Sequence, residues 1–159
     1  MAGSTTDLSP EARATYDAII DVRSPAEFAE DHLPGAINLP VLDDAQRAEI
    51  GTIYVQTSKF LARRQGAAMV ARNIAAHLEG QLAERTGGFR PLVYCWRGGQ
   101  RSGAMATVMS QADRPVTRPE GGYQTWRRRV LSRPYDPAPH GPDFRRPLLL
   151  RPTGRGQTA

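Results

Sequence analysis

The sequence has a single cysteine, Cys95, among its 159 residues. One cysteine excludes an internal disulfide and a zinc site built from several thiolates. The three histidines, His32, His77 and His140, lie far apart along the chain. We therefore expect no metal and no other cofactor.

Long hydrophobic runs are also absent, because every apolar stretch is shorter than the roughly 20 residues that a membrane span needs. The first residues, MAGSTTDLSPEARATYD, are polar and acidic, unlike a secretory signal. These absences predict a cytoplasmic protein without a membrane partner. The length fits one domain with a tail.

Acidic residues are scarce at the carboxyl-terminal end. Residues 1–113 carry 11 basic and 13 acidic side chains (−2), whereas residues 114–159 carry 10 basic and 3 acidic side chains (+7). Arg127, Arg128 and Arg129 fit contacts with RNA phosphates, and they fit a solvated helix face equally well. Composition leaves a tRNA partner open, and no DNA partner is predicted.

The most informative stretch is residues 92–102, LVYCWRGGQRS. Residues 92–94 are typical of a buried strand and residues 102–112 of a helix, so Cys95 is predicted at the carboxyl end of a strand, facing a helix start. Gly98 and Gly99 permit positive φ, which lets successive N–H groups turn inward as an anion-binding nest. Ser102 is the predicted cap of the helix.

This loop predicts nucleophilic chemistry. The inward-facing N–H groups, the helix start and the guanidinium groups of Arg97 and Arg101 all favour a thiolate. Cys95 is therefore the predicted catalytic nucleophile. An inert buried cysteine needs neither a glycine nest nor two arginines. The Trp96 ring is predicted to pack or to stack a base or an isoprenoid. Anion or substrate binding is predicted for Trp96, Arg97, Gly98, Gly99, Gln100, Arg101 and Ser102.

Strands and helices are predicted to alternate along the chain. This alternation indicates an α/β fold with a central, mostly parallel sheet and helices on both faces. Asp21 and Arg23 are predicted to pair locally at a strand end. The predicted strands cover residues 18–22, 36–39, 92–94 and 116–117, and the predicted helices start at residue 24 or cover residues 43–56 (broken at Gly51), 65–82, 102–112 and 123–131.

Several motifs, in this order, resemble the rhodanese superfamily. Residues 20–23 (IDVR), Glu27-Phe28 and residues 32–38 (HLPGAIN) are similar to its amino-terminal motifs. Residues 95–102 occupy the position of its active-site loop, and residues 120–122 with Trp126 are similar to its closing turn and helix. The resemblance spans about residues 17–131 and implies a rhodanese-like fold.

A narrower resemblance is to the rhodanese domain of tRNA 2-selenouridine synthases. It rests on residues 46–56 (QRAEIGTIYVQ), 66–78 (GAAMVARNIAAHL) and 95–102 (CWRGGQRS), whose loop has an extra residue. The family replaces the sulfur of wobble 2-thiouridine in tRNA by selenium from selenophosphate, through a geranylated intermediate. The resemblance thus implies a persulfide or perselenide on Cys95.

In that family a P-loop domain follows the rhodanese domain. The final residues, LLLRPTGRGQTA, are similar to its start, with Arg151 in place of the first glycine and Gln157 in place of the lysine. We therefore predict three parts: a polar segment (1–16), a rhodanese-like domain (17–131), and a Pro/Arg-rich tail (132–159) that ends in a degenerate, truncated P-loop-like segment.

Other functions fit parts of the loop. Cys95 and Arg101 match the C-x5-R-[ST] pattern of cysteine phosphatases, although Tyr94 stands where tyrosine phosphatases usually carry histidine. A stand-alone thiosulfate-type sulfurtransferase and a non-catalytic anion-binding module are further alternatives. The main prediction is sulfur or selenium transfer, with selenophosphate or a sulfane-sulfur donor as the partner.

Overall fold

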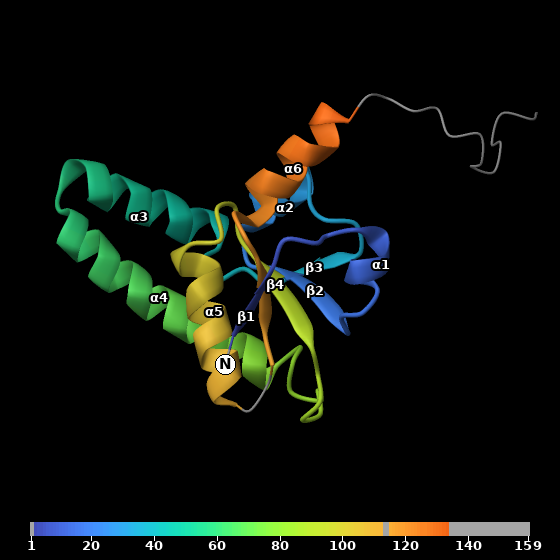
Figure 1. Ribbon diagram of the computed structural model, residues 1–159. Helices are drawn as coiled ribbons and strands as arrows, with labels where there is room; N and C mark the ends of the chain where they lie inside the picture. Colours follow the sequence, from blue (N-terminus) through green and yellow to red (C-terminus); the bar gives the residue numbers. More distant parts are fainter. Residues whose placement is uncertain (1, 113–114, 134–159) are drawn as a thin grey trace, which may run out of the picture.

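The computed structural model describes residues 2–112 and 115–133 (Figure 1). Within these residues, no helix has the length and apolar character needed to cross a membrane. The elements, in chain order, are β1 (Gly3–Thr5), α1 (Pro10–Arg13), β2 (Ala18–Asp21), α2 (Pro25–Glu30), β3 (Ala36–Asn38), α3 (Asp44–Gln56), α4 (Lys59–Glu79), β4 (Pro91–Tyr94), α5 (Gln100–Gln111), β5 (Thr117–Pro119) and α6 (Gly122–Ser132).

The strands form one parallel sheet in the order β1-β5-β4-β2-β3. Strand β4 lies in the middle, and its register with β2 places Val93 beside Ile20 and Tyr94 beside Asp21. Helices cover both faces of the sheet (Figure 1). The predicted α/β fold with a parallel sheet is confirmed.

Side chains of β4 alternate between two hydrophobic cores, because successive residues of a strand point to opposite faces. Leu92 and Tyr94 pack with Tyr123 of α6 on one face. Val93 and Cys95 pack on the other face, in the core that contains Met105 of α5. The residue that follows the strand, Cys95, thus belongs to the face covered by α4 and α5.

Helices α3 and α4 differ most from the prediction. Helix α3 continues through Gly51, so the predicted break is wrong. A glycine inside a helix costs only about 1 kcal/mol, and α3 is held by a capping box between Asp43 and Gln46 and by packing against α4. Helix α4 begins at Lys59 rather than residue 65, because the Ser58 side chain caps it by accepting a hydrogen bond from the Leu61 N–H.

The segment 1–16, expected to be only a polar segment, contains β1 and α1. Strand β1 has three residues, GST, and so lacks the alternation of apolar and polar residues from which a strand is predicted. It pairs with β5 in parallel, with Gly3 beside Thr117, and the Gly3 N–H donates to the carbonyl of Val116, the residue before β5, at 2.7 Å. The tail at residues 134–159, with the P-loop-like segment, lies outside the described residues.

Candidate active site around Cys95

Cys95 lies directly after β4 and is buried, with 3% of its surface exposed. Its Sγ lies 3.2 Å from the Oγ of Ser102, a buried residue in the first turn of α5. A thiol there donates to the hydroxyl oxygen, and a thiolate accepts from the hydroxyl hydrogen. Ser102 can therefore bind the sulfur in both states.

Helix α5 begins at Gln100, and its N-cap is Gly99. Ser102 is therefore not the cap that the sequence predicted; its side chain faces Cys95 instead. The first N–H groups of a helix have no acceptor inside the helix and carry its positive dipole end. The start of α5 thus supplies hydrogen-bond donors and positive potential beside the cysteine.

The loop between Cys95 and Gly99 is clamped by the start of α6. The Tyr123 N–H donates to the Cys95 carbonyl at 3.0 Å, and the Gln124 N–H donates to the Trp96 carbonyl at 2.9 Å. Gly98 has the predicted positive φ, +70°, whereas Gly99 has φ −90°. One glycine of the pair therefore makes the left-handed turn.

The close approach of the loop to α6 depends on Gly122. Its φ is +62°, and a Cβ there would lie 2.5 Å from the Cys95 carbonyl oxygen and 2.7 Å from that of Trp96. Sequence reasoning identified residues 121–122 only as a turn. The clamp on the cysteine loop appears only when the two segments meet in three dimensions.

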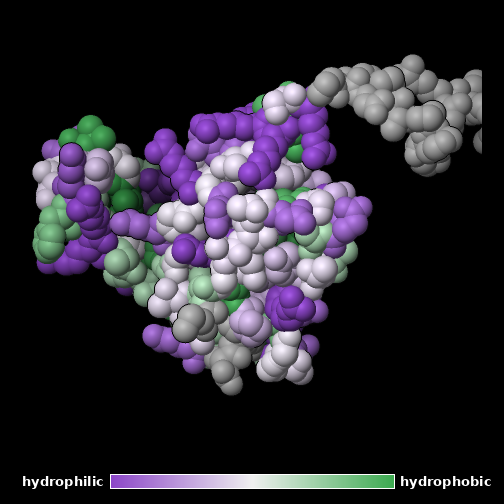
Figure 2. Space-filling model, in the orientation of Figure 1, coloured by the Kyte–Doolittle hydropathy of each residue, from purple (hydrophilic) through white to green (hydrophobic). Residues whose placement is uncertain are grey.

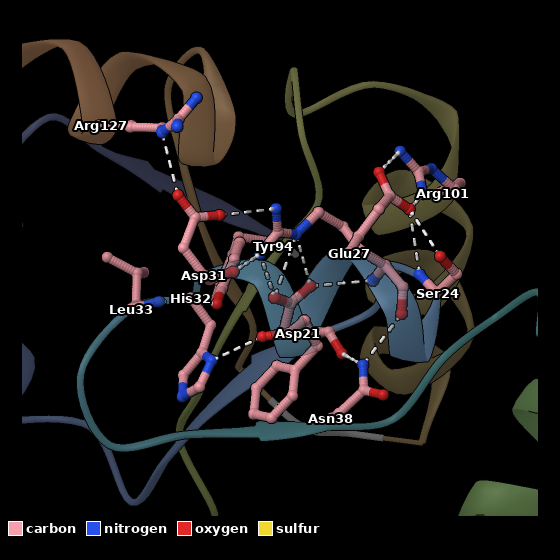
Figure 3. Close-up of polar contacts among 12 residues, drawn as sticks. Asp21, Ser24, Glu27, Asp31, His32, Leu33, Asn38, Tyr94, Arg101 and Arg127 are labelled. Carbon is pink, nitrogen blue, oxygen red and sulfur yellow. Dashed lines mark hydrogen bonds and ion pairs between the residues drawn. The ribbon is translucent and has the colours of Figure 1, made fainter. Parts of the chain in front are cut away.

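Arg101 is held by a carboxylate from another part of the chain. Its Nη1 lies 2.7 Å from Glu27 Oε2 in α2, and Glu27 Oε2 also accepts from the N–H and the hydroxyl of Ser24 (Figure 3). Arg47 of α3 lies 3.4 Å from the same oxygen. One carboxylate therefore links α2, α3 and α5 at the edge of the site.

These contacts set the charge of Glu27. Partial burial alone would raise its pKa, but the hydrogen bonds and attraction from Arg101, with smaller contributions from Ser24 and Arg47, bring the pKa below its ordinary value. Glu27 is thus ionised at neutral pH. In the sequence, Glu27 belongs to one of the motifs that resemble the family, and no signal in the sequence pairs it with Arg101.

The remaining predicted loop residues do not gather around the Cys95 sulfur. Arg97 and Gln100 are exposed, and Trp96 is half-buried with its ring 5.9 Å from that of Tyr123. The packing interpretation of Trp96 therefore fits the structure. Because Arg101 binds Glu27 and Arg97 is exposed, a joint role of the two arginines in holding a donor stays a prediction.

Below the loop, Arg23 and Asp21 form the predicted local pair. The Arg23 Nη2 lies 2.8 Å from Asp21 Oδ2, and both side chains are buried. Burial opposes the charged form of Arg23, yet the hydrogen bond and attraction of Asp21 keep its pKa above the ordinary value. Its guanidinium lies 4.3 Å from the centre of the Tyr123 ring, so it supports the helix that clamps the loop.

A cavity of about 540 Å³, here named the hairpin groove, opens between α3, α4 and α5. Its lining includes Ile50, Tyr54, Arg63, Val70, Arg101 and Ala104. Within residues 2–112 and 115–133, no group of three or more His, Cys, Asp or Glu residues could hold a metal ion.

Comparisons with known proteins agree with this geometry. Residues 6–129 match the family model "Rhodanese-like domain". The chain is 37% identical over 134 residues to the tRNA 2-selenouridine synthase of Chromohalobacter salexigens, covering 80% of this chain and 36% of that protein. It is 35% identical over 144 residues to the synthase of Nitrosomonas europaea, covering 88% and 36%. The chain thus spans about a third of the length of these relatives.

Solved structures give the same fold. The N-terminal domain of a putative ATP/GTP binding protein from Clostridium difficile is 34% identical with a TM-score of 0.62, covering 77% of this chain and 96% of that one. A rhodanese-related protein from Thermoplasma volcanium, 18% identical with a TM-score of 0.50, covers 80% of this chain and 92% of that one.

Proposed function

The chain belongs to the rhodanese-like family, and we propose that it is a sulfur- or selenium-transfer domain whose carrier is Cys95. The observation that carries this proposal is the position of Cys95: after the central strand, 3.2 Å from Ser102, and beside the start of α5. This arrangement supports the proposal because the first turn of α5 brings a hydroxyl, N–H groups and the positive end of the helix dipole to the side of the sulfur.

The transfer step follows from thiolate chemistry. With thiosulfate, the Cys95 thiolate attacks the outer sulfur, a new S–S bond forms, the donor's S–S bond breaks, and sulfite leaves with the electron pair. A nucleophilic acceptor then takes the outer sulfur, and Cys95 leaves as the thiolate. The step needs no acid, whereas a phosphatase needs a carboxylic acid to protonate its leaving group. Glu27, ionised by its arginine partners, is unsuited to that role.

The acceptor that we propose is tRNA. The curated relatives are named tRNA 2-selenouridine synthases, and the extra loop residue and residues 46–56 resemble that family. In that reaction 2-thiouridine at the wobble position becomes 2-selenouridine, with selenophosphate as the selenium donor. Since this chain spans about a third of those relatives, we propose that it supplies the chalcogen-carrying part of the reaction.

The test is Cys95→Ser. We expect the wild-type chain to gain one sulfur atom by mass spectrometry after thiosulfate, and to release that sulfur to a thiol acceptor. The Ser variant should show neither and lose at least about 100-fold in transfer rate, because its hydroxyl does not ionise at neutral pH. Circular dichroism checks its fold. Transfer that survives in a folded Ser variant, or aryl phosphate hydrolysis in place of transfer, would overturn the proposal.

A further inference from the structure

We propose that the α3–α4 hairpin is the surface on which RNA docks, with hairpin cations binding phosphates and the hairpin groove receiving one unstacked nucleoside beside the cysteine loop. This inference rests on the proposed function, which makes tRNA the acceptor. It adds the place where the RNA binds. Four features of the hairpin support it: its exposure, its charge, its groove and the position of that groove beside the start of α5.

The hairpin projects away from the sheet (Figure 1). None of the 13 residues of α3 is buried. Near the turn between α3 and α4, Val55 is 83% exposed, Phe60 is 72% exposed, and Tyr54 is also exposed. In Figure 2 the hairpin carries both hydrophobic and strongly hydrophilic groups. Exposed aromatic rings among cations are suited to stacking with single-stranded bases.

The charge of the hairpin complements a polyanion. Residues 44–79 carry five basic and three acidic side chains (+2), and the three acidic residues lie outside residues 50–78, which contain one lysine and three arginines. Lys59, Arg63 and Arg64 are exposed, and none of them forms an ion pair with another described residue. Phosphate contacts by such cations supply much of the affinity of RNA-binding proteins.

The arginine cluster of α6, the other candidate from the sequence, is partly engaged within the protein. Arg127 Nε lies 2.9 Å from Asp31 Oδ2, and Arg129 Nη1 donates to the Thr6 carbonyl at 2.8 Å. These contacts occupy two of its three guanidinium groups. In the hairpin, Lys59 lies 5.5 Å from the centre of the Tyr54 ring, and Arg63 and Arg64 form no ion pair with another described residue. The hairpin therefore offers a phosphate backbone more guanidinium groups without an ion pair or hydrogen bond than α6 does.

The hairpin groove has the size and lining for a nucleoside. Its volume of about 540 Å³ lies in the range of small-ligand sites, roughly 300–1,000 Å³. Ile50, Val70 and Ala104 give apolar walls, Tyr54 gives an aromatic ring, and Arg63 gives a cation. A flat base fits such walls, and its flanking phosphates would meet the cation.

The groove also lies next to the turn of α5 that contacts the cysteine. Its α5 side is formed by Gln100, Arg101 and Ala104, and the next residue after Arg101 is Ser102, whose hydroxyl contacts Cys95. Cys95 packs on the same face of the sheet as α4 and α5. A nucleoside in the groove would therefore lie on the same side of the sheet as Cys95.

The test compares two triple variants for binding of a tRNA carrying 2-thiouridine, measured by fluorescence anisotropy over a range of KCl concentrations. The first is Lys59→Gln/Arg63→Gln/Arg64→Gln, and the matched control is Arg127→Gln/Arg128→Gln/Arg129→Gln. We expect the hairpin variant to bind at least 10-fold more weakly near 150 mM salt. Its salt slope should fall by about 2–3, since each lost phosphate contact contributes about 0.7–0.9. The control should change less than threefold.

A second measurement locates the RNA directly. A tRNA with a photoreactive thiouridine at the wobble position should crosslink to peptides of α3 or α4 in the wild-type chain. Crosslinks confined to α6, equal losses in the two variants, or no tRNA binding at all would overturn the inference. Persulfide formation on wild-type Cys95 is measured without RNA. If the chain loads sulfur but the hairpin variant binds tRNA as tightly as the wild type, this inference is refuted and the proposed function stands.

Discussion

At the scale of single residues, the site depends on the carboxylate of Glu27, which lies 74 positions before its partner Arg101 in the chain. Glu27 binds Arg101, Arg47 and Ser24 at once. An unpaired Arg101 would be free to swing into solvent or toward an anion. Glu27 therefore fixes both the conformation of Arg101 and the net charge at the edge of the cysteine loop.

Glu27→Gln should lower the free energy of unfolding at pH 7 and have less effect in acid. Because the pKa of Glu27 is below its ordinary value in the folded chain, its stabilisation is complete above the unfolded pKa, about 4.3, and is lost as pH falls through the folded pKa. Urea unfolding at several pH values measures this. Glu30→Gln, an exposed residue of the same helix, is the control, and identical pH profiles for the two variants would contradict the role of the ion pair.

At the scale of elements, the loop after β4 and the start of α6 form one unit. Two hydrogen bonds from α6 N–H groups hold the Cys95 and Trp96 carbonyls. The absence of a side chain at Gly122 permits this contact. Helix α6 is thus part of the support of the site rather than an independent surface helix.

Gly122→Ala should destabilise the chain by about 3 kcal/mol or more, because the new Cβ meets three backbone atoms and the φ of +62° is strained for alanine. It should also slow sulfur loading, since the clamp on the loop opens. Gly51→Ala in α3 is the matched control: nothing lies within 4 Å of its Cβ, so it should stabilise by about 0.5–1 kcal/mol. Thermal unfolding and persulfide mass measure both. Similar effects of the two changes would rule out the clamp.

At the scale of the whole molecule, the amino-terminal residues add an edge strand to the sheet. Strand β1 pairs with β5, the Glu120 N–H donates to the Thr5 carbonyl, and Arg129 reaches the Thr6 carbonyl. Leu8 packs beside the core that contains Tyr123. The start of the chain thus stabilises β5 and α6. These two elements in turn hold the cysteine loop in place.

Removing residues 2–7 should lower the Tm by roughly 10 °C. The change removes at least three hydrogen bonds worth about 1 kcal/mol each, and one kcal/mol corresponds to about 3–5 °C for a domain of this size. Differential scanning calorimetry measures the shift. A Tm within about 2 °C of the full chain would show that β1 adds nothing to the sheet.

The sequence by itself determined the alternation of strands and helices and the place of the cysteine. Period-2 and helical patterns are local, so the sequence alone shows them. The two glycines shortly after Cys95, Gly98 and Gly99, likewise predict a turn with positive φ beside the cysteine. Local signals also predicted the Asp21–Arg23 pair, since its members are two residues apart. The added β1, the unbroken α3 and the true start of α5 did not follow, because neighbouring elements decide whether short or glycine-containing segments keep their structure.

Only the tertiary structure decided which distant groups meet. Glu27 with Arg101, Gly122 with the Cys95 and Trp96 carbonyls, and the hairpin groove beside α5 all join segments that are far apart in the chain. Residue types and spacing carry no record of these contacts, because the parallel sheet brings the ends of separate strands to one edge. The choice of Cys95 as the proposed nucleophile therefore comes from the sequence, and its surroundings come from the fold.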